Sequence, residues 1–124
     1  MKVYISGPYE AGTEAKKQFN IARAADFAAI LLRLGFVPFC PHTMSADFEL
    51  RYPDIPRQRY IEVDLEWIQC CDVVLMLPGW KASQGALAEK FFAMQHAIPV
   101  FCTIRELVDW KEEQVHGCKE EVEE

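Results

Sequence analysis

The chain has 124 residues, 51% of them hydrophobic and 26% charged, which is typical of one ordinary globular domain. The formal net charge is -6 and no basic run is present, so a nucleic-acid or anionic-membrane partner is not expected, because phosphate contacts need clustered Lys and Arg. A small phosphorylated ligand stays open, since a helix N-terminus or one Arg can hold it.

Four short runs of β-branched and aromatic residues predict strands, at 2–6, 36–40, 72–77 and 99–103. Apolar residues at helical spacing predict helices from Thr13 to about 34, then at 57–70, 83–97 and 104–116. Residues 41–56 are expected to form a long loop of the kind that serves as a lid or binding segment. The acidic composition after about residue 117 favours a disordered tail.

This alternation of strands and helices indicates an α/β fold, a three-layer Rossmann/flavodoxin-like parallel sheet of four to five strands with helices on both faces. Ligands of such folds bind outside the carboxyl ends of the strands. The rule selects residues 7–13, the loop after Cys40, and residues 78–85.

The cysteine count is odd, and the cysteines have no zinc-ligand spacing, so we expect no metal site. We interpret the thiols as reduced, buried side chains of a cytoplasmic protein. No signal peptide and no apolar run of the roughly 20 residues that a membrane span needs are recognised. The cysteines are Cys40, Cys70, Cys71, Cys102 and Cys118.

Two acidic residues lie where a helix is expected to be apolar. Asp64 falls in the middle of the apolar side of the helix at 57–70, where it either caps a backbone group, pairs with an Arg, or points into a site. Glu89 has small or apolar neighbours one turn away, including Gly85 and Ala86, and it belongs either to a site or to a buried ion pair.

The loops at the expected ligand edge carry further candidates. Ser83 is suited to cap the helix that follows, or to bind an anion together with Gly79 and Gly85 at that helix N-terminus. Trp80 and Tyr9 can either sandwich a ring or pack locally.

Three segments together resemble the nucleoside 2-deoxyribosyltransferase superfamily, including its nucleoside 5'-monophosphate N-glycosidases. The segments are Tyr4-Ile5-Ser6-Gly7-Pro8, Asp64-Leu65-Glu66-Trp67-Ile68 followed by Asp72-Val73-Val74, and Ser83-Gln84-Gly85-Ala86-Leu87-Ala88-Glu89. The resemblance covers residues 1 to about 103 and is greatest to small bacterial and phage members. It implies one deoxyribosyltransferase-like domain over residues 1–124 that associates as a homodimer or higher oligomer and needs no cofactor.

The resemblance also implies roles for single residues. Glu89 matches the nucleophile that attacks the anomeric carbon, Tyr4 the residue that orients it, and Asp64 the residue that assists proton delivery to the leaving base. Ser83 matches the serine of the monophosphate hydrolases, where transferases of free nucleosides carry an Asp. Substrate contacts are expected from Ser6, Gly7, Pro8, Tyr9, Gly79, Trp80, Ser83 and Gly85.

The expected reaction is therefore cleavage of the base–sugar bond of a nucleoside or deoxynucleoside 5'-monophosphate, with Glu89 ionised and Asp64 at least partly protonated. One alternative is a deoxyribosyltransferase that exchanges bases on free nucleosides. Another is a nucleotide-binding protein without catalysis. The base and the sugar stay open.

Overall fold

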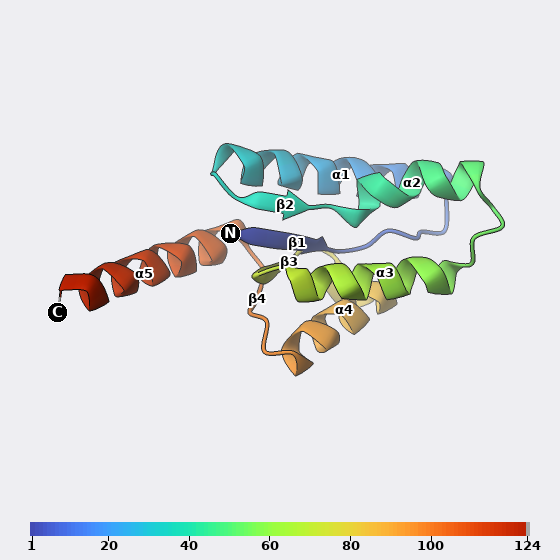
Figure 1. Cartoon of the computed structure of the whole chain (residues 1–124). Coiled ribbons are helices and arrows are strands. Elements are labelled where there is room, and N and C mark those ends of the chain that lie inside the picture. The colour runs from blue at the N-terminus through green and yellow to red at the C-terminus, as the bar shows by residue number, and fades with distance from the viewer. Residues whose placement is uncertain (124) are drawn as a thin grey trace.

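The computed structural model describes the backbone of residues 1–123 and the side chains of residues 1–115. Strands and helices alternate along most of the chain (Figure 1). The elements are β1 (Lys2–Ser6), α1 (Glu14–Arg33), β2 (Val37–Phe39), α2 (Pro41–Arg51), α3 (Arg57–Cys70), β3 (Val73–Met76), a 3-10 turn η1 (Trp80–Ala82), α4 (Gln84–Gln95), β4 (Val100–Phe101) and α5 (Ile104–Glu123).

The four strands form one parallel sheet in the order β2-β1-β3-β4, so the expected three-layer α/β fold is confirmed. Figure 1 shows α1 and α2 on one side of the sheet and α3 and α4 on the other. Strand order reverses between β1 and β3, because β1 leads outward to β2 while β3 leads to β4. This is the point at which open α/β sheets bind ligands.

Alternating side chains of the central strands divide the core between the two faces. Val3 and Ile5 of β1 belong to the cluster that α1 and α5 cover, together with Leu31 and Leu107. Tyr4 belongs to the cluster on the α3 and α4 side. Polar side chains of β1 that face α4 are therefore surrounded by apolar neighbours.

The helix ends follow the signals in the sequence. The Thr13 side chain accepts a hydrogen bond from Lys16 N at 3.2 Å and begins α1. Gly35 follows α1 with a φ of +87°, a left-handed conformation that favours glycine. Ser83 begins α4 by accepting from Ala86 N at 3.2 Å, which confirms its predicted capping role.

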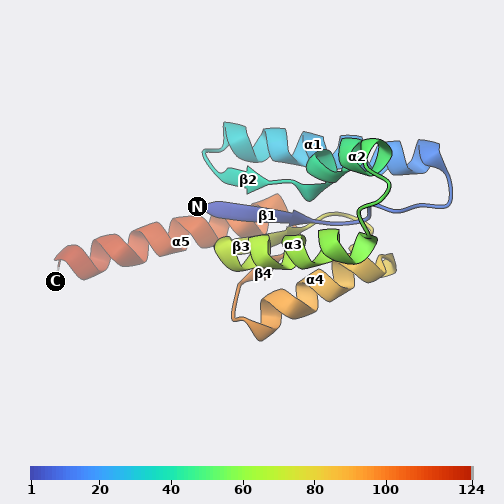
Figure 2. The same cartoon turned by 45° about the vertical axis from the view of Figure 1, so that its right-hand side comes forward.

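The predicted loop at 41–56 is wrong. Pro41 begins the 11-residue helix α2, and only residues 52–56 connect it to α3. Proline suits the first turn of a helix, because its missing N–H has no partner there in any case. α2 packs beside α1 beyond the carboxyl end of β2, as Figure 2 also shows.

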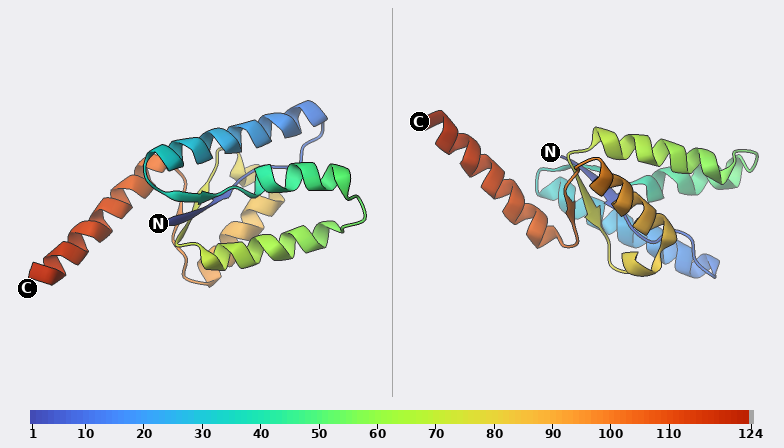
Figure 3. Two further views of the ribbon diagram at one scale, coloured as in Figure 1. Left: turned by 45° about the horizontal axis from the view of Figure 1, so that its top comes forward. Right: turned by 90° about the horizontal axis from the view of Figure 1, so that it is seen from below.

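The last helix continues past its predicted end near residue 116. Ile104 and Leu107, in the first turns of α5, pack into the core. Further along, the helix runs away from the sheet to Glu123, as both views of Figure 3 show. Glu124, the last residue of the acidic tail, lies outside the described residues.

The expectation that the cysteines are buried needs correction. Cys40, Cys70, Cys71 and Cys102 are free thiols as predicted, but Cys70 and Cys102 are exposed rather than buried. The side chain of Cys118 lies outside the described residues.

Within the described part of the chain, no helix is long and apolar enough to cross a membrane.

The apolar surface of α4 is only partly covered. One stripe stays exposed, at Leu87, Phe91 and Met94. The expected homodimer stays a prediction.

Candidate active site

The floor of the candidate site is made by two hydroxyl groups of β1. Tyr4 and Ser6 are two residues apart on a strand, so both point to the α3 and α4 side of the sheet. Both residues are fully buried. A buried hydroxyl needs a hydrogen-bond partner, and both find the same one.

That partner is the Glu89 carboxylate of α4. The Tyr4 hydroxyl donates to Glu89 Oε2, and Ser6 Oγ donates to Glu89 Oε1 at 2.7 Å. Because each carboxylate oxygen is held by a different hydroxyl, the orientation of the group is fixed. No cation lies within ion-pair distance of Glu89 among the described side chains, so the buried ion-pair alternative is wrong.

Burial raises the pKa of Glu89 from 4.5 to about 7. The hydrogen bonds from Tyr4 and Ser6 act in the opposite direction and lower this pKa, whereas the nearby charge of Asp64 raises it further. The pKa of Tyr4 lies well above its ordinary value, because the phenol is buried and two carboxylates face it. Tyr4 therefore stays a hydrogen-bond donor at any physiological pH.

Asp64 is the second carboxylate of the site. It is partly buried on α3, and burial raises its pKa from 3.8 to about 6. Its charge acts on both Glu89 and Tyr4, so it lies near them. Asp64 makes no hydrogen bond or ion pair within the described side chains. Arg59, in the first turn of the helix, pairs instead with Glu62 at 3.3 Å, and Arg57 makes no ion pair among the described side chains. The capping and Arg-pairing alternatives are therefore wrong.

The order of the two pKa values differs from the expectation that Glu89 is ionised while Asp64 holds the proton. The pKa of Glu89 is raised to about 7 and that of Asp64 to about 6. In the free protein Glu89 is therefore not the more readily ionised of the two groups, and both titrate near neutral pH. The cause is the deeper burial of Glu89, which outweighs its two hydrogen bonds.

Three glycines shape the space around this pair. A Cβ at Gly7 would lie 2.7 Å from Leu77 Cβ, so only glycine lets the ends of β1 and β3 approach this closely. Gly79 has a φ of +88°, and a Cβ there would lie 3.3 Å from Pro8 Cγ. Gly85 lies one turn before Glu89 on α4, and a Cβ there would meet open space. The space beside Gly85, one turn before Glu89, is thus not filled by other parts of the chain.

Ser83 and Trp80 lie near the start of α4. Ser83 Oγ is used as an acceptor by the helix cap, but its own proton remains free to donate to a ligand. Trp80 is partly buried against the core on this side of the sheet, and Lys90 Nζ lies 4.4 Å from its ring centroid. Local packing thus accounts for much of the Trp80 ring surface.

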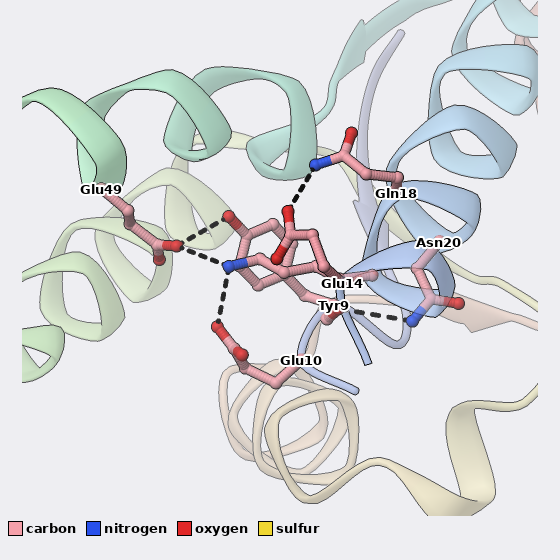
Figure 4. A network of polar contacts seen from close by, with 7 residues as sticks. Tyr9, Glu10, Glu14, Gln18, Asn20 and Glu49 are labelled. Atoms are coloured by element: carbon pink, nitrogen blue, oxygen red, sulfur yellow. Dashed lines mark hydrogen bonds and ion pairs between the residues drawn. The ribbon is translucent and has the colours of Figure 1, made fainter. Parts of the chain in front are cut away.

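Tyr9 lies in a different environment, between α1 and α2 (Figure 4). Its hydroxyl donates to Glu49 Oε2 at 2.9 Å, and Lys17 Nζ donates to the same oxygen at 3.1 Å. Lys17 also lies 4.8 Å from the Tyr9 ring centroid and 3.6 Å from Glu10 Oε1. The polar contacts of Tyr9 thus go to residues outside the carboxylate pair, which favours its packing role.

Two residues that shape the ligand edge were not predicted from the sequence. His42 Nε2 lies 3.2 Å from Gly7 O and 3.0 Å from Pro8 O, so it is the protonated ring nitrogen that donates to these carbonyl groups. Burial lowers the pKa of His42, which keeps the ring neutral. Arg23 Nη2, from α1, donates to Pro78 O at 2.7 Å.

The chemistry available at this edge is that of two carboxylates and their hydroxyl donors. Among the described side chains, no group of three His, Cys, Asp or Glu residues is arranged to hold a metal ion. The arrangement can place a negative charge at a fixed position and move a proton nearby, the two requirements of glycosidic-bond cleavage by a carboxylate pair.

No curated protein matches the chain. One family model does match, over residues 1–102, and its description is a domain of unknown function, DUF4406. The matched span contains all four strands of the sheet and every residue of the site described above. The chain belongs to the DUF4406 family.

Proposed function

We propose that this protein is an N-glycosidase that cleaves the base–sugar bond of a nucleoside or deoxynucleoside 5'-monophosphate. The observation that carries the proposal is the Glu89 carboxylate, held by Tyr4 and Ser6 with Asp64 nearby and, among the described side chains, no cation paired to it. The resemblance of these residues to the nucleoside 2-deoxyribosyltransferase superfamily supports the same assignment.

In the proposed reaction, the bond between the anomeric carbon and the base nitrogen breaks, and its electron pair leaves with the base. Asp64 supplies a proton to the base, directly or through water. An oxygen of Glu89 attacks the anomeric carbon from the opposite face and forms a glycosyl ester. A water molecule then cleaves this ester, which restores the Glu89 carboxylate, and the proton released by the water returns to Asp64.

The hydroxyls of Tyr4 and Ser6 have a positioning role in this scheme. They hold the carboxylate in one orientation before the substrate arrives, so little reorganisation is needed during attack. They also lower the pKa of Glu89 and so increase the ionised, nucleophilic fraction.

We place the 5'-phosphate at the start of α4. Free N–H groups of a helix N-terminus favour an anion, and the Ser83 hydroxyl can donate to it while still capping the helix. An Asp at this position would repel the phosphate. The hydroxyl therefore favours a monophosphate over a free nucleoside.

The first test is base release from a panel of nucleoside 5'-monophosphates and nucleosides, with and without a second base. We expect hydrolysis of monophosphates by the wild type, and loss of at least a thousandfold in kcat for Glu89→Ala, since the nucleophile cannot be replaced by water at comparable rate. Glu66→Gln, an exposed acid on α3, is the matched control and should keep full activity.

Other outcomes of the same assay support other functions. Exchange of one base for another on free nucleosides would indicate a transferase. Nucleotide binding without turnover that persists in Glu89→Ala would indicate a binding protein. If Glu89→Ala were insoluble while Glu66→Gln was not, Glu89 would have a structural role and the proposal would fail.

A further inference from the structure

Tyr60 carries a buried hydroxyl that has no assigned role. Among the described residues, three buried side-chain polar atoms have no hydrogen-bond partner: Arg23 Nε, His42 Nδ1 and Tyr60 Oη. Arg23 and His42 each make a hydrogen bond through another atom of the same group. The Tyr60 hydroxyl makes none, and burying such a group without a partner is unfavourable by about 1–3 kcal/mol. A buried group of this kind needs an explanation.

The position of Tyr60 on α3 relates it to the candidate site. Tyr60 is four residues before Asp64, so both lie on the same side of the helix, about 6 Å apart along its axis. Trp67, seven residues further on, lies on that side too and stacks on Phe39 of β2 with ring centroids 4.7 Å apart. This side of α3 therefore faces the sheet.

The direction of α3 places Tyr60 at the ligand edge. Because β1 and β3 are parallel and α3 leads into β3, the helix runs from the carboxyl edge of the sheet back toward its amino edge. Tyr60, in the first turns of α3, thus lies one turn closer to the carboxyl edge than Asp64. A ligand that reaches Asp64 from this edge passes Tyr60.

We propose that the Tyr60 hydroxyl hydrogen-bonds the base of the bound nucleotide and contributes to base specificity. The inference rests on the proposed function, which assigns Asp64 to the leaving base, and Tyr60 is the next inward-facing polar group along the same helix. A phenol hydroxyl both donates and accepts, so it can pair with a ring nitrogen or an exocyclic group of a base. The unpaired hydroxyl of the free protein is satisfied when the ligand binds.

This role makes a prediction that a structural role does not. If the hydroxyl has no partner in the free protein, Tyr60→Phe removes no hydrogen bond there and leaves the unfolding temperature equal or higher. In the complex, the same change removes one hydrogen bond to the ligand and lowers affinity about fivefold. The loss should be largest for the preferred base, so that differences between bases become smaller.

The experiment compares Tyr60→Phe with Tyr52→Phe, a matched control at a residue that lies in the connection from α2 to α3 and is about half exposed. Thermal unfolding is measured on the free proteins. Affinity for a panel of nucleoside 5'-monophosphates is measured calorimetrically in a Glu89→Gln background, which prevents turnover. Only Tyr60→Phe should lose affinity, in a base-dependent way and without loss of stability, while Tyr52→Phe should match the parent protein.

The outcomes separate this inference from the proposed function. Equal affinities of Tyr60→Phe and its parent for every base, or a lower unfolding temperature than Tyr52→Phe, would overturn the inference alone. A base-dependent loss of affinity together with no base release by the wild type would overturn the glycosidase and leave the Tyr60 contact standing. No affinity of the parent for any monophosphate would overturn both.

Discussion

The two carboxyl groups of the site differ in how they are held. Glu89 has a donor on each oxygen, whereas Asp64 has none among the described residues. Burial nevertheless raises the pKa of Glu89 to about 7 and that of Asp64 to about 6. The form required by the proposed mechanism, with Glu89 ionised and Asp64 protonated, is then only one of the protonation forms present near neutral pH. The population of this form is greatest between the two pKa values and falls on either side.

The pH dependence of kcat/KM should therefore be bell-shaped, with its maximum between about pH 6 and 7. Activity falls below this range because Glu89 takes up a proton, and above it because Asp64 loses one. Asp64→Asn should remove the alkaline limb and lower the maximum rate about 100- to 10,000-fold, the usual contribution of a general acid. Steady-state kinetics from pH 4 to 9 test this, and an unchanged alkaline limb in Asp64→Asn would exclude Asp64 as the acid.

The sequence singled out Glu89 and Asp64 as candidates because an acid on an apolar helix face is unusual, and Tyr4 because its segment resembles that of the nucleoside 2-deoxyribosyltransferase superfamily. It did not reveal that Ser6, which is expected to touch substrate, also donates to Glu89 at 2.7 Å. Ser6 lies two residues after Tyr4 on the same strand, so the sequence does indicate that the two side chains point to the same face of the sheet. The contacts of His42 join residues about 35 positions apart and have no local sequence signal.

At the level of elements, the strands and four of the helices were predictable because their apolar periodicity agrees with their burial. α2 was not, since Pro41, Thr43 and Ser45 are typical of turns. Two signals in the sequence did point to a helix. Pro41 is suited to a first turn, and Asp47 and Arg51 have the four-residue spacing of a helical ion pair, which the structure shows at 3.0 Å. Packing against α1 provides the rest of the stabilisation, and this cannot be read from residues 41–51 alone.

The start of α4 allows a test in which stability and activity change in opposite directions. Gly85→Ala should stabilise the protein by up to about 1 kcal/mol, because alanine is favoured over glycine in a helix and its Cβ meets no atom within 4 Å. The added methyl group lies between Glu89 and the start of α4, where the 5'-phosphate is proposed to bind, so KM should rise severalfold.

Urea unfolding and steady-state kinetics measure the two effects. Gly12→Ala is the control, because its Cβ also meets no neighbour but lies in the loop before α1. It should leave KM unchanged. A Gly85→Ala protein with the wild-type KM would show that the substrate does not use this space.

At the scale of the whole molecule, the site places an acid among residues that would otherwise form a continuous apolar core. The Glu89 pKa of about 7 in the folded protein exceeds its ordinary value of 4.5, so the folded state binds the proton more tightly than the unfolded chain. This contribution to stability is complete below about pH 4.5 and is lost as the pH rises through 7. Asp64, whose pKa is also raised, acts in the same direction.

Glu89→Gln should therefore increase the free energy of unfolding at pH 8 by up to about 3 kcal/mol, a figure that the loss of one acceptor for Tyr4 and Ser6 will reduce. The difference from the wild type should shrink to near zero, or reverse, at pH 4. Chemical denaturation at the two pH values measures it, with Glu66→Gln as reference. A Glu89→Gln protein less stable than the wild type at pH 8 would contradict the pKa assignment.

The close approach of Gly7 to Leu77 has a consequence for how this domain can diversify. With only 2.7 Å between a Cβ at position 7 and Leu77 Cβ, even one methyl group would push apart the two central strands that hold the site together. Position 85 carries no such restriction. Mutational freedom around the site is thus uneven: new substrate preferences can evolve, or be selected in a library, through the entrance formed by α4, while the junction of β1 and β3 must stay unchanged.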